Sequence, residues 1–517
     1  DKRSGAMATL AEMLSAVSQQ HHDKMAFWEA GNHYSYGQFL NRVQRAAGAL
    51  KQKGLRTGER FAVIAPNCID TAVLLYAGYW SGTVPVPLNI RLAPPEIRYM
   101  LDDCEAQCLF IDDSLADLLN NDSLSSWKES AIYMGSKDKS RSFETFINEA
   151  EKLSICRTNP NDDAIFLYTG GTTGRSKGVR LSHRNVLSNA LQCAPTFAPR
   201  RDDIYLHAAP MFHSADLLGT VWFLFGAGHV YMPTFTPVGL LETIERYRVT
   251  FTMLPPTMII MALQVPDFDS YDLSSLRALI YGASPMDVEW IKKTINALSS
   301  VELYQGYGLT ETSPLLTILS WQAHRDALET ENYDRLKSCG RSITGIELRI
   351  FNDQDQEVPS GEAGEVVARA PSVMKGYLNR EEETKEALKS GWFHTGDIGK
   401  VDSDGFVYQL DRKKDMVISG GENIYTSEVE AILYKHPGVH EAAVIGIPDK
   451  KFGEALLAFI VPASDITLTV DDIIEHCRGK IGGYKIPRRI QLVDAMPKSA
   501  LGKILKADLR KIALGGA

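Results

Sequence analysis

Apolar positions along the chain follow two spacings that alternate between residues 36 and 112. Helical spacing predicts helices at 38–53, 71–81 and 94–103. Short apolar runs between them predict strands at 60–65, 83–87 and 108–111. Helices that alternate with short buried strands are typical of a parallel sheet covered by helices. A similar alternation returns between residues 164 and 301, so the pattern predicts two α/β units.

The pattern changes toward the C-terminus. Residues 348–368 consist of strand-like runs separated by turns, which predicts a small β unit. Ser427 followed by Glu430 has the spacing of a capping box and predicts a helix that ends near Pro437. A second helix is predicted at 470–478, and strands are predicted at 442–447, 456–461 and 489–493. The last hundred residues therefore predict a compact α+β module.

The composition is that of a soluble globular protein, with 517 residues of which 44% are hydrophobic and 23% are charged. Length alone predicts three or four folding units of about 150 residues each. These values exclude a disordered chain, a collagen-like repeat and a small disulfide scaffold. No apolar run approaches the length of a membrane span and no secretory signal is recognised, so we expect a cytoplasmic protein.

The net charge of −9 is distributed unevenly. From Arg412 onward the chain carries +3, and the part before it carries −12. An acidic chain argues against a nucleic-acid partner. A basic module beside an acidic one indicates a polyanionic ligand between them, although ordinary charge variation explains the split equally well.

Seven cysteines, an odd number, are spread thinly along the chain. Cys104 and Cys108 are close together, on a predicted helix, and no His/Cys pair elsewhere matches them. This argues against a zinc site, and we expect reduced thiols in a cytosolic protein.

The strongest local signal is a loop rich in Gly and Thr at 168–178, which follows an apolar run at 164–167. Glycines let backbone N–H groups approach an anion closely, threonine hydroxyls add donors, and Lys177 adds a positive charge. The Gly-Lys-Ser/Thr ending of a Walker A loop is absent. The loop therefore predicts a polyphosphate cradle, and a surface loop without a ligand is the alternative.

This loop resembles the phosphate loop of the adenylate-forming superfamily, which comprises acyl-CoA synthetases, adenylation domains and luciferases. It departs from the commonest version at Gly170, where Ser is frequent, and at Ser176, where Pro is frequent. Further motifs at 207–213, 282–285, 304–312, 391–397, 411–425 and 497–504 follow in the superfamily's order. Over essentially its whole length, the chain is identified as a member of the acyl-CoA synthetase branch of this superfamily.

The resemblance implies a role for one or more residues of each motif. Tyr307 would stack on adenine, Thr310 would touch the α-phosphate and Glu311 would hold Mg²⁺, which prefers a few carboxylate oxygens together with substrate phosphates. His213 would lie at the acyl pocket, and Asp397 would accept both ribose hydroxyls.

The C-terminal motifs complete the implied site. Arg412 would contact the ribose, Lys414 stands at the hinge position, and Lys503 would meet the α-phosphate and the attacking carboxylate. The residues expected to line the path of CoA are Gly420, Gly421 and Glu422. Basic residues that would meet the phosphates of CoA are Arg478, Lys480, Lys485, Arg488 and Arg489, with a solvated basic face as an equal alternative.

The implied site is summarised by three sets of residues. The predicted catalytic residues are Lys503, Thr310, Glu311 and Lys177. The predicted ATP site comprises Thr169, Gly170, Gly171, Thr172, Thr173, Gly174, Lys177, Ala283, Ser284, Pro285, Gln305, Gly306, Tyr307, Gly308, Thr310, Asp397, Arg412 and Lys503. The predicted acyl pocket comprises His213, Gly282, Gly306 and Gly308.

The fold implied by the resemblance is α/β, with a large N-terminal AMP-binding domain at 1–410 and a mobile C-terminal α+β lid domain at 416–517. The N-terminal domain would contain α/β subdomains at about 7–195 and 196–345 and a small β-barrel at 346–410. Residues 411–415 would form the hinge.

The reaction implied by the resemblance has two halves. A carboxylate attacks the α-phosphorus of ATP to give an acyl-AMP and pyrophosphate, with Lys503, Mg²⁺ and the loop donors offsetting the repulsion between the two anions. After rotation about the hinge, which withdraws Lys503 and brings in the face at 420–422, CoA takes the acyl group. The implied partners are small molecules (the acid, ATP and CoA), and a homodimer is compatible with the sequence.

The identity of the acid is narrowed by the pocket residues. An amino acid is disfavoured because His213 stands after Phe212 where amino-acid-activating relatives carry an Asp for the ammonium group. Gly282, Gly306 and Gly308 are expected to leave room for an elongated acyl group. We therefore expect a medium- or long-chain fatty acid. The alternative for the acid is an arylpropenoic, 4-coumarate-like acid. The alternatives for the second step are transfer of the acyl group to a carrier protein or oxidation of the adenylate as in luciferases. A non-catalytic sensor is a further alternative, which the retention of Glu311 and Lys503 disfavours.

Overall fold

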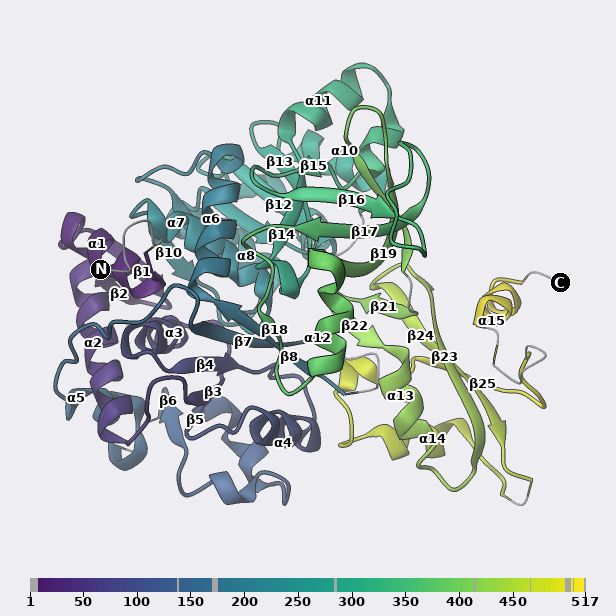
Figure 1. The fold of residues 1–517 in the computed structure, drawn as a ribbon, viewed down its shortest axis with the longest axis horizontal. Helices are drawn as coiled ribbons and strands as arrows, with labels where there is room; N and C mark the ends of the chain where they lie inside the picture. The colour runs from purple at the N-terminus through teal and green to yellow at the C-terminus, as the bar shows by residue number, and fades with distance from the viewer. Residues whose placement is uncertain are drawn as a thin grey trace.

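The computed structural model describes residues 8–136, 139–169, 175–282, 286–412, 415–464, 466–497, 504 and 506–515. Its described part consists of a large N-terminal domain and a smaller C-terminal domain beside it (Figure 1). Each domain is built around sheets with buried apolar residues on both faces. No helix in the described ranges is both long and apolar enough to cross a bilayer.

The first sheet is the parallel one predicted from residues 36–112. Its strands, in spatial order, are β4 (Val84–Pro87), β3 (Arg60–Ile64), β5 (Leu109–Asp112) and β6 (Ile132–Met134). Successive strand residues point to opposite faces, so Phe61 and Val63 join one core and Ala62 and Ile64 join another.

Helices cover both faces of this sheet. The first core holds α1 (Leu10–Gln20), α2 (Tyr36–Gln52), α3 (Ile69–Ser81) and α5 (Phe143–Asn148), and the second holds α4 (Pro94–Asp103). α4 has the predicted bounds. Cys104 follows its last residue and Cys108 precedes β5, so the expectation that both cysteines lie on one helix is wrong.

The second sheet has nine strands. In spatial order they are β15 (Arg341–Ser342), β14 (Leu315–Leu319), β13 (Glu302–Gly308), β12 (Ala278–Gly282), β11 (Phe251–Leu254), β9 (Ile204–His207), β10 (Gly228–Tyr231), β1 (Met25–Glu29) and β2 (Asn32–Ser35). The strands from β13 to β1 are parallel to one another. Their carboxyl ends therefore meet along one edge, where open α/β sheets bind ligands.

Helices also cover both faces of the nine-stranded sheet. α6 (His183–Phe197) and α7 (Gly219–Leu224) contribute to one core. The other core is formed with α8 (Pro237–Tyr247), α9 (Pro256–Leu263), α10 (Val288–Ala297) and α11 (Trp321–Glu329). A small antiparallel sheet of β18 (Gly376–Tyr377), β8 (Lys177–Ser182) and β7 (Asp163–Thr169) carries the two ends of the predicted phosphate loop.

The predicted β unit is an antiparallel sheet of β16 (Glu347–Phe351), β17 (Gly364–Arg369), β19 (Phe393–Val401) and β20 (Val407–Arg412). Among the described strands no pairing joins β16 to β20, so the sheet is open rather than the small barrel that was expected. α12 (Glu381–Ala387) lies between β18 and β19 in the chain and contacts both.

The C-terminal domain is an α+β module, as the pattern predicts. Its sheet has the order β22 (Glu422–Tyr425), β21 (Met416–Ser419), β24 (Gly453–Pro462) and β23 (Val439–Asp449), with β25 (Arg489–Leu492) parallel to β24. α13 (Thr426–Leu433) and α14 (Val470–Cys477) cover one face. α15 (Lys506–Ala513) covers the other, on the side away from the large domain (Figure 1).

Candidate active site

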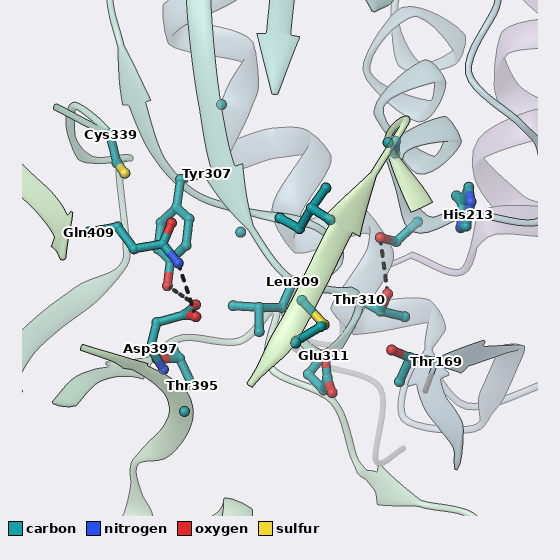
Figure 2. A pocket seen from close by; sticks show the side chains of 18 of the residues that line it. Thr169, His213, Tyr307, Leu309, Thr310, Glu311, Cys339, Thr395, Asp397 and Gln409 are labelled. Carbon is teal, nitrogen blue, oxygen red and sulfur yellow. Dashed lines mark hydrogen bonds between the residues drawn. The ribbon is translucent and has the colours of Figure 1, made fainter. Parts of the chain in front are cut away.

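One large pocket lies at the carboxyl ends of β9, β11, β12 and β13. Its volume is about 790 Å³, and its lining also includes residues of β19, β20, β21 and β22. Both domains therefore contribute to it. Figure 2 shows Tyr307, Asp397 and Gln409 gathered at one end and His213, Thr310 and Thr169 at the other.

The first end of the pocket is built around the Asp397 carboxylate, which is 4% exposed. One of its oxygens accepts a hydrogen bond from the Tyr307 hydroxyl at 2.7 Å, and the other accepts one from the Gln409 amide at 3.0 Å. Burial together with the neighbouring Asp397 carboxylate holds the pKa of Tyr307 well above its ordinary value, so the tyrosine remains a donor. These contacts join β13, β19 and β20 within the large domain.

A buried acceptor beside this end fits a nucleobase. Gln305 lines the pocket, and its side-chain oxygen is buried without a hydrogen-bond partner among the described residues. A buried carbonyl without a donor costs free energy, and a donor such as an adenine amino group would remove that cost. ATP therefore fits the donors and acceptors that the structure provides here.

The phosphate-facing part of the pocket holds Lys177 and Glu311, each 8% exposed. The Lys177 ammonium lies 4.2 Å from the centroid of the Tyr377 ring, and the Tyr377 hydroxyl donates to Glu311 Oε1 at 2.8 Å. Burial raises the pKa of Glu311, while the positive charge of Lys177 opposes the shift. Burial disfavours the charged form of this carboxylate, and a divalent cation that accompanies phosphates would stabilise that form. Mg²⁺ therefore fits this position.

Thr310 joins the phosphate part to the acyl part. Its hydroxyl donates to the Ser214 hydroxyl at 3.3 Å, and Ser214 begins a short 3-10 helix, Ser214–Leu218. Thr169 lines the same pocket from the end of β7.

The C-terminal domain enters the pocket through Glu422, which is the first residue of β22 and is buried. Its Oε1 accepts from Arg91 at 2.9 Å, and its Oε2 lies 3.1 Å from His213 Nε2. Burial alone would raise the pKa of Glu422, but His213, Arg91 and Lys485 together hold it below its ordinary value. Gly420 and Gly421 line the pocket beside it. The face at 420–422 therefore lines the pocket together with residues of the large domain.

Lys485 does not belong to a solvated basic face. It is 4% exposed, and its ammonium bonds Glu96 of the large domain at 2.8 Å and Glu428 of the C-terminal domain at 2.7 Å. The adjacent Tyr484 hydroxyl accepts from Asn89 at 3.2 Å across the same interface. The expectation that Lys485 meets the phosphates of CoA is therefore wrong in this arrangement, because two carboxylates already occupy its ammonium.

The three glycines predicted to line the acyl pocket are required by a different physical constraint from the one expected. A Cβ added to Gly306 would lie 2.9 Å from Leu315 Cδ2, and one added to Gly308 would lie 1.8 Å from the Pro314 carbonyl oxygen. A Cβ at Gly282 would lie 2.7 Å from the Gly306 carbonyl oxygen. The space beside these glycines is already filled by protein, so they permit close packing of strands rather than leave room for an elongated acyl group.

Several predicted residues fall outside the described residues: Gly170, Gly171, Thr172, Thr173, Gly174, Ala283, Ser284, Pro285, Lys414 and Lys503. Arg412 pairs with Asp397 in the strand ladder, and its side chain is not described. The sequence reasoning missed Gln409, Tyr377 and Arg91. Each of these three residues lies outside the motif positions to which the resemblance assigns a role, so no local sequence pattern identifies it.

Comparison with known proteins identifies the family of the chain. The profile of the AMP-binding enzyme family matches residues 14–378, and that of the AMP-binding enzyme C-terminal domain matches residues 428–503. The chain belongs to the adenylate-forming superfamily. A feruloyl-CoA synthase of Amycolatopsis sp. is 35% identical over 93% of this chain and 94% of its own. The long-chain-fatty-acid–CoA ligase FadD13 of Mycobacterium tuberculosis is 34% identical over 92% of each chain.

A solved structure supports the same assignment. The o-succinylbenzoate CoA synthetase MenE of Bacillus subtilis, bound to a CoA product analogue, superposes with a TM-score of 0.84 at 27% identity, over 96% of this chain and 98% of its own. The adenylate former described here is an ATP-dependent, AMP-forming acyl-CoA synthetase that uses Mg²⁺ and CoA.

Proposed function

We propose that the acid is a medium- or long-chain fatty acid. The single observation that carries this is the apolar lining between His213 and the strand ends. The lining residues with apolar side chains here are Ala209, Ala215, Met253 and Leu309. Methionine is unbranched and adapts to a flexible chain.

An arylpropenoic acid is the second candidate. The relative with 35% identity is named a feruloyl-CoA synthase. The two candidates differ in rigidity and in cross-section, so a panel of acids separates them.

In the first half-reaction, we infer that Lys177, Lys503 and Thr310 offset the charge that develops as the carboxylate meets the α-phosphate. Glu311 holds Mg²⁺, which supplies charge neutralisation for the phosphates. Asp397 orients the ribose from the opposite end of the pocket, so the nucleotide is held at both ends. Holding acid and nucleotide in line supplies a further part of the acceleration.

In the second half-reaction, we infer that the pantetheine arm of CoA enters beside Gly420 and Gly421, with Glu422 orienting His213 at its mouth. Lys414 serves as the hinge between the two arrangements. A cytoplasmic location and a homodimer stay predictions of the sequence.

The test is pyrophosphate release with ATP and Mg²⁺ across straight-chain acids from acetate to palmitate, together with benzoate and cinnamate, each with and without CoA. We expect release to peak at a medium- or long-chain acid, with AMP and a thioester formed when CoA is present. A peak at cinnamate selects the second candidate, and a peak at acetate contradicts the proposed chain length. Acid-dependent release that leaves CoA unacylated contradicts CoA as the acceptor and points to a carrier protein.

A further inference from the structure

The segment that carries His213 into the pocket lies against a buried polar cluster. β9 ends at His207, and residues 208–213 then belong to neither a helix nor a strand before the 3-10 helix Ser214–Leu218 begins. In the described contacts these six residues join no strand ladder, and a backbone hydrogen bond links the His213 N–H to the Pro210 carbonyl oxygen at 3.0 Å. Contacts from side chains add to this single turn.

Asn67 supplies the first of these contacts. It lies between β3 and α3 and is 5% exposed. Its amide nitrogen donates to the carbonyl oxygens of His207 and Ala209, each at 2.9 Å. Its amide oxygen accepts from the Met211 backbone N–H at 2.8 Å. One buried side chain thus pairs three backbone groups of the segment, as a neighbouring strand would.

A hydrogen bond joins the residues on either side of the segment. His207 Nδ1 lies 2.6 Å from Asp216 Oδ1, and Asp216 belongs to the 3-10 helix. His207 is 3% exposed, and its other ring nitrogen lies 2.9 Å from His229 Nδ1. Gly219 allows this ring position, because a Cβ there would lie 2.5 Å from His207 Cε1.

The held segment forms the acyl wall. Ala209, His213, Ser214 and Ala215 line the pocket. Ser214 accepts from Thr310, and His213 contacts Glu422 of the C-terminal domain. The ribose end, built from β13, β19 and β20, has no contact with the cluster in the described hydrogen bonds. A shift of the segment therefore moves the acyl wall and leaves the ribose end in place.

We propose that Asn67 and the His207–Asp216 pair are positioning residues that set the acyl wall and His213 for reaction. They act through the segment and touch no substrate. The proposal rests on the acyl-CoA synthetase activity but not on which acid is used, since each variant is measured with the acid that the unaltered enzyme prefers.

The test compares Asp216→Ala with Asp216→Asn in the full-length enzyme. Asn keeps an oxygen that accepts from His207, whereas Ala removes the contact. We expect Asp216→Ala to lower kcat/KM for the acid on the order of 10²-fold, because small misplacements of a positioned group have effects of this size. We expect KM for ATP to stay unchanged and Asp216→Asn to retain most of the activity. Asn67→Ala should behave as Asp216→Ala does.

Gly219→Ala provides an independent route to the same change. Its φ of −54° and ψ of −25° suit alanine, so the backbone tolerates the substitution while the new Cβ displaces the His207 ring. Asp203→Asn is the control at the other end of β9, where a buried carboxylate pairs with Arg277 at 2.6 Å. It should lower thermal stability and leave the KM for the acid unchanged.

Two results would overturn the proposal. The first is that Asp216→Ala and Gly219→Ala lose stability, as Asp203→Asn does, with kcat/KM for the acid unchanged. The second is a parallel loss for ATP and acid in every variant. If Asp216→Ala does not fold, Gly219→Ala and Asp216→Asn still decide the matter. An unaltered enzyme that rejects every fatty acid refutes the proposed acid and leaves the positioning test intact with another acid.

Discussion

The two ends of the pocket are assembled in different ways. At the end proposed to bind the ribose, Tyr307, Asp397 and Gln409 contact one another within the large domain. At the end proposed to admit CoA, Glu422 belongs to the C-terminal domain, whereas Arg91 and His213 belong to the large one. The first set needs no contact from the C-terminal domain, and the second exists when the domains meet as they do here.

This difference indicates which part of the site depends on contact between the two domains. Lys485 bridges Glu96 and Glu428 across the interface, where the ammonium is buried and each carboxylate side chain is 12% exposed. Charges buried in such a cluster lose hydration, so their net contribution to holding the domains together is modest, although removal of one partner is costly. An interface of this kind closes specifically and still opens, as an enzyme with two half-reactions requires.

The largest effect is expected from Lys503→Ala. Since the resemblance places this lysine at the first half-reaction, we expect adenylation to slow by on the order of 10³-fold, the upper range for loss of one transition-state donor. Transfer to CoA from supplied acyl-AMP should stay unchanged in single-turnover assays. Lys506→Ala, which removes a lysine paired with Glu430, is the control. Equal loss of both half-reactions would refute the assignment.

The ribose end is tested by Asp397→Asn. The charged acceptor is lost, and hydrogen bonds to charged groups contribute about 1.5–3 kcal/mol. We therefore expect KM for ATP to rise by roughly 10- to 100-fold. Tyr307→Phe, which removes one donor to Asp397, should raise it less. An unchanged KM for ATP together with a raised KM for the acid would contradict the account.

The smallest effect is expected from pH. Burial in the interface raises the pKa of Glu428 to about 7, with Lys485 opposing the shift and Glu96 reinforcing it. Because the pKa is higher in the closed arrangement than in water, closure takes up a proton. Closure should therefore weaken as pH rises from 4.5, the ordinary value for a Glu carboxyl, to about 7, and this group should add no further change above that. An interdomain fluorescence distance followed from about pH 4.5 to about pH 8 should show this change and its levelling off.

Glu428→Gln is the matched variant for the pH experiment. It keeps the shape of the side chain and removes the titrating group, so the pH dependence of the interdomain distance should disappear. A dependence that persists in this variant would assign the effect to another group, with Glu96 and Tyr484 the nearest titratable neighbours.

Elements with strong local patterns could be predicted from the sequence. The first parallel sheet and α4 were predicted because apolar periodicity and the prolines at 94–95 are local signals. The open sheet that replaces the expected barrel depends on pairing between distant strands, which local pattern does not encode. The motifs led to Tyr307 and Asp397, but Gln409 and Arg91 meet the site through tertiary contacts alone. For Lys485 the sequence indicates a charge but not its burial.

Contacts between the domains form the end of the pocket proposed to admit CoA and not the end proposed to bind the ribose. The decisive measurement is the single-turnover rate of each half-reaction in Lys485→Met, with Lys480→Met, at an exposed lysine of the same module, as the control. Two partly buried carboxylates would lose their partner in the closed arrangement, at a cost of roughly 3 kcal/mol. We predict transfer to CoA slower by on the order of 10²-fold with adenylation unchanged. Equal slowing of both half-reactions, or of neither, would contradict this prediction.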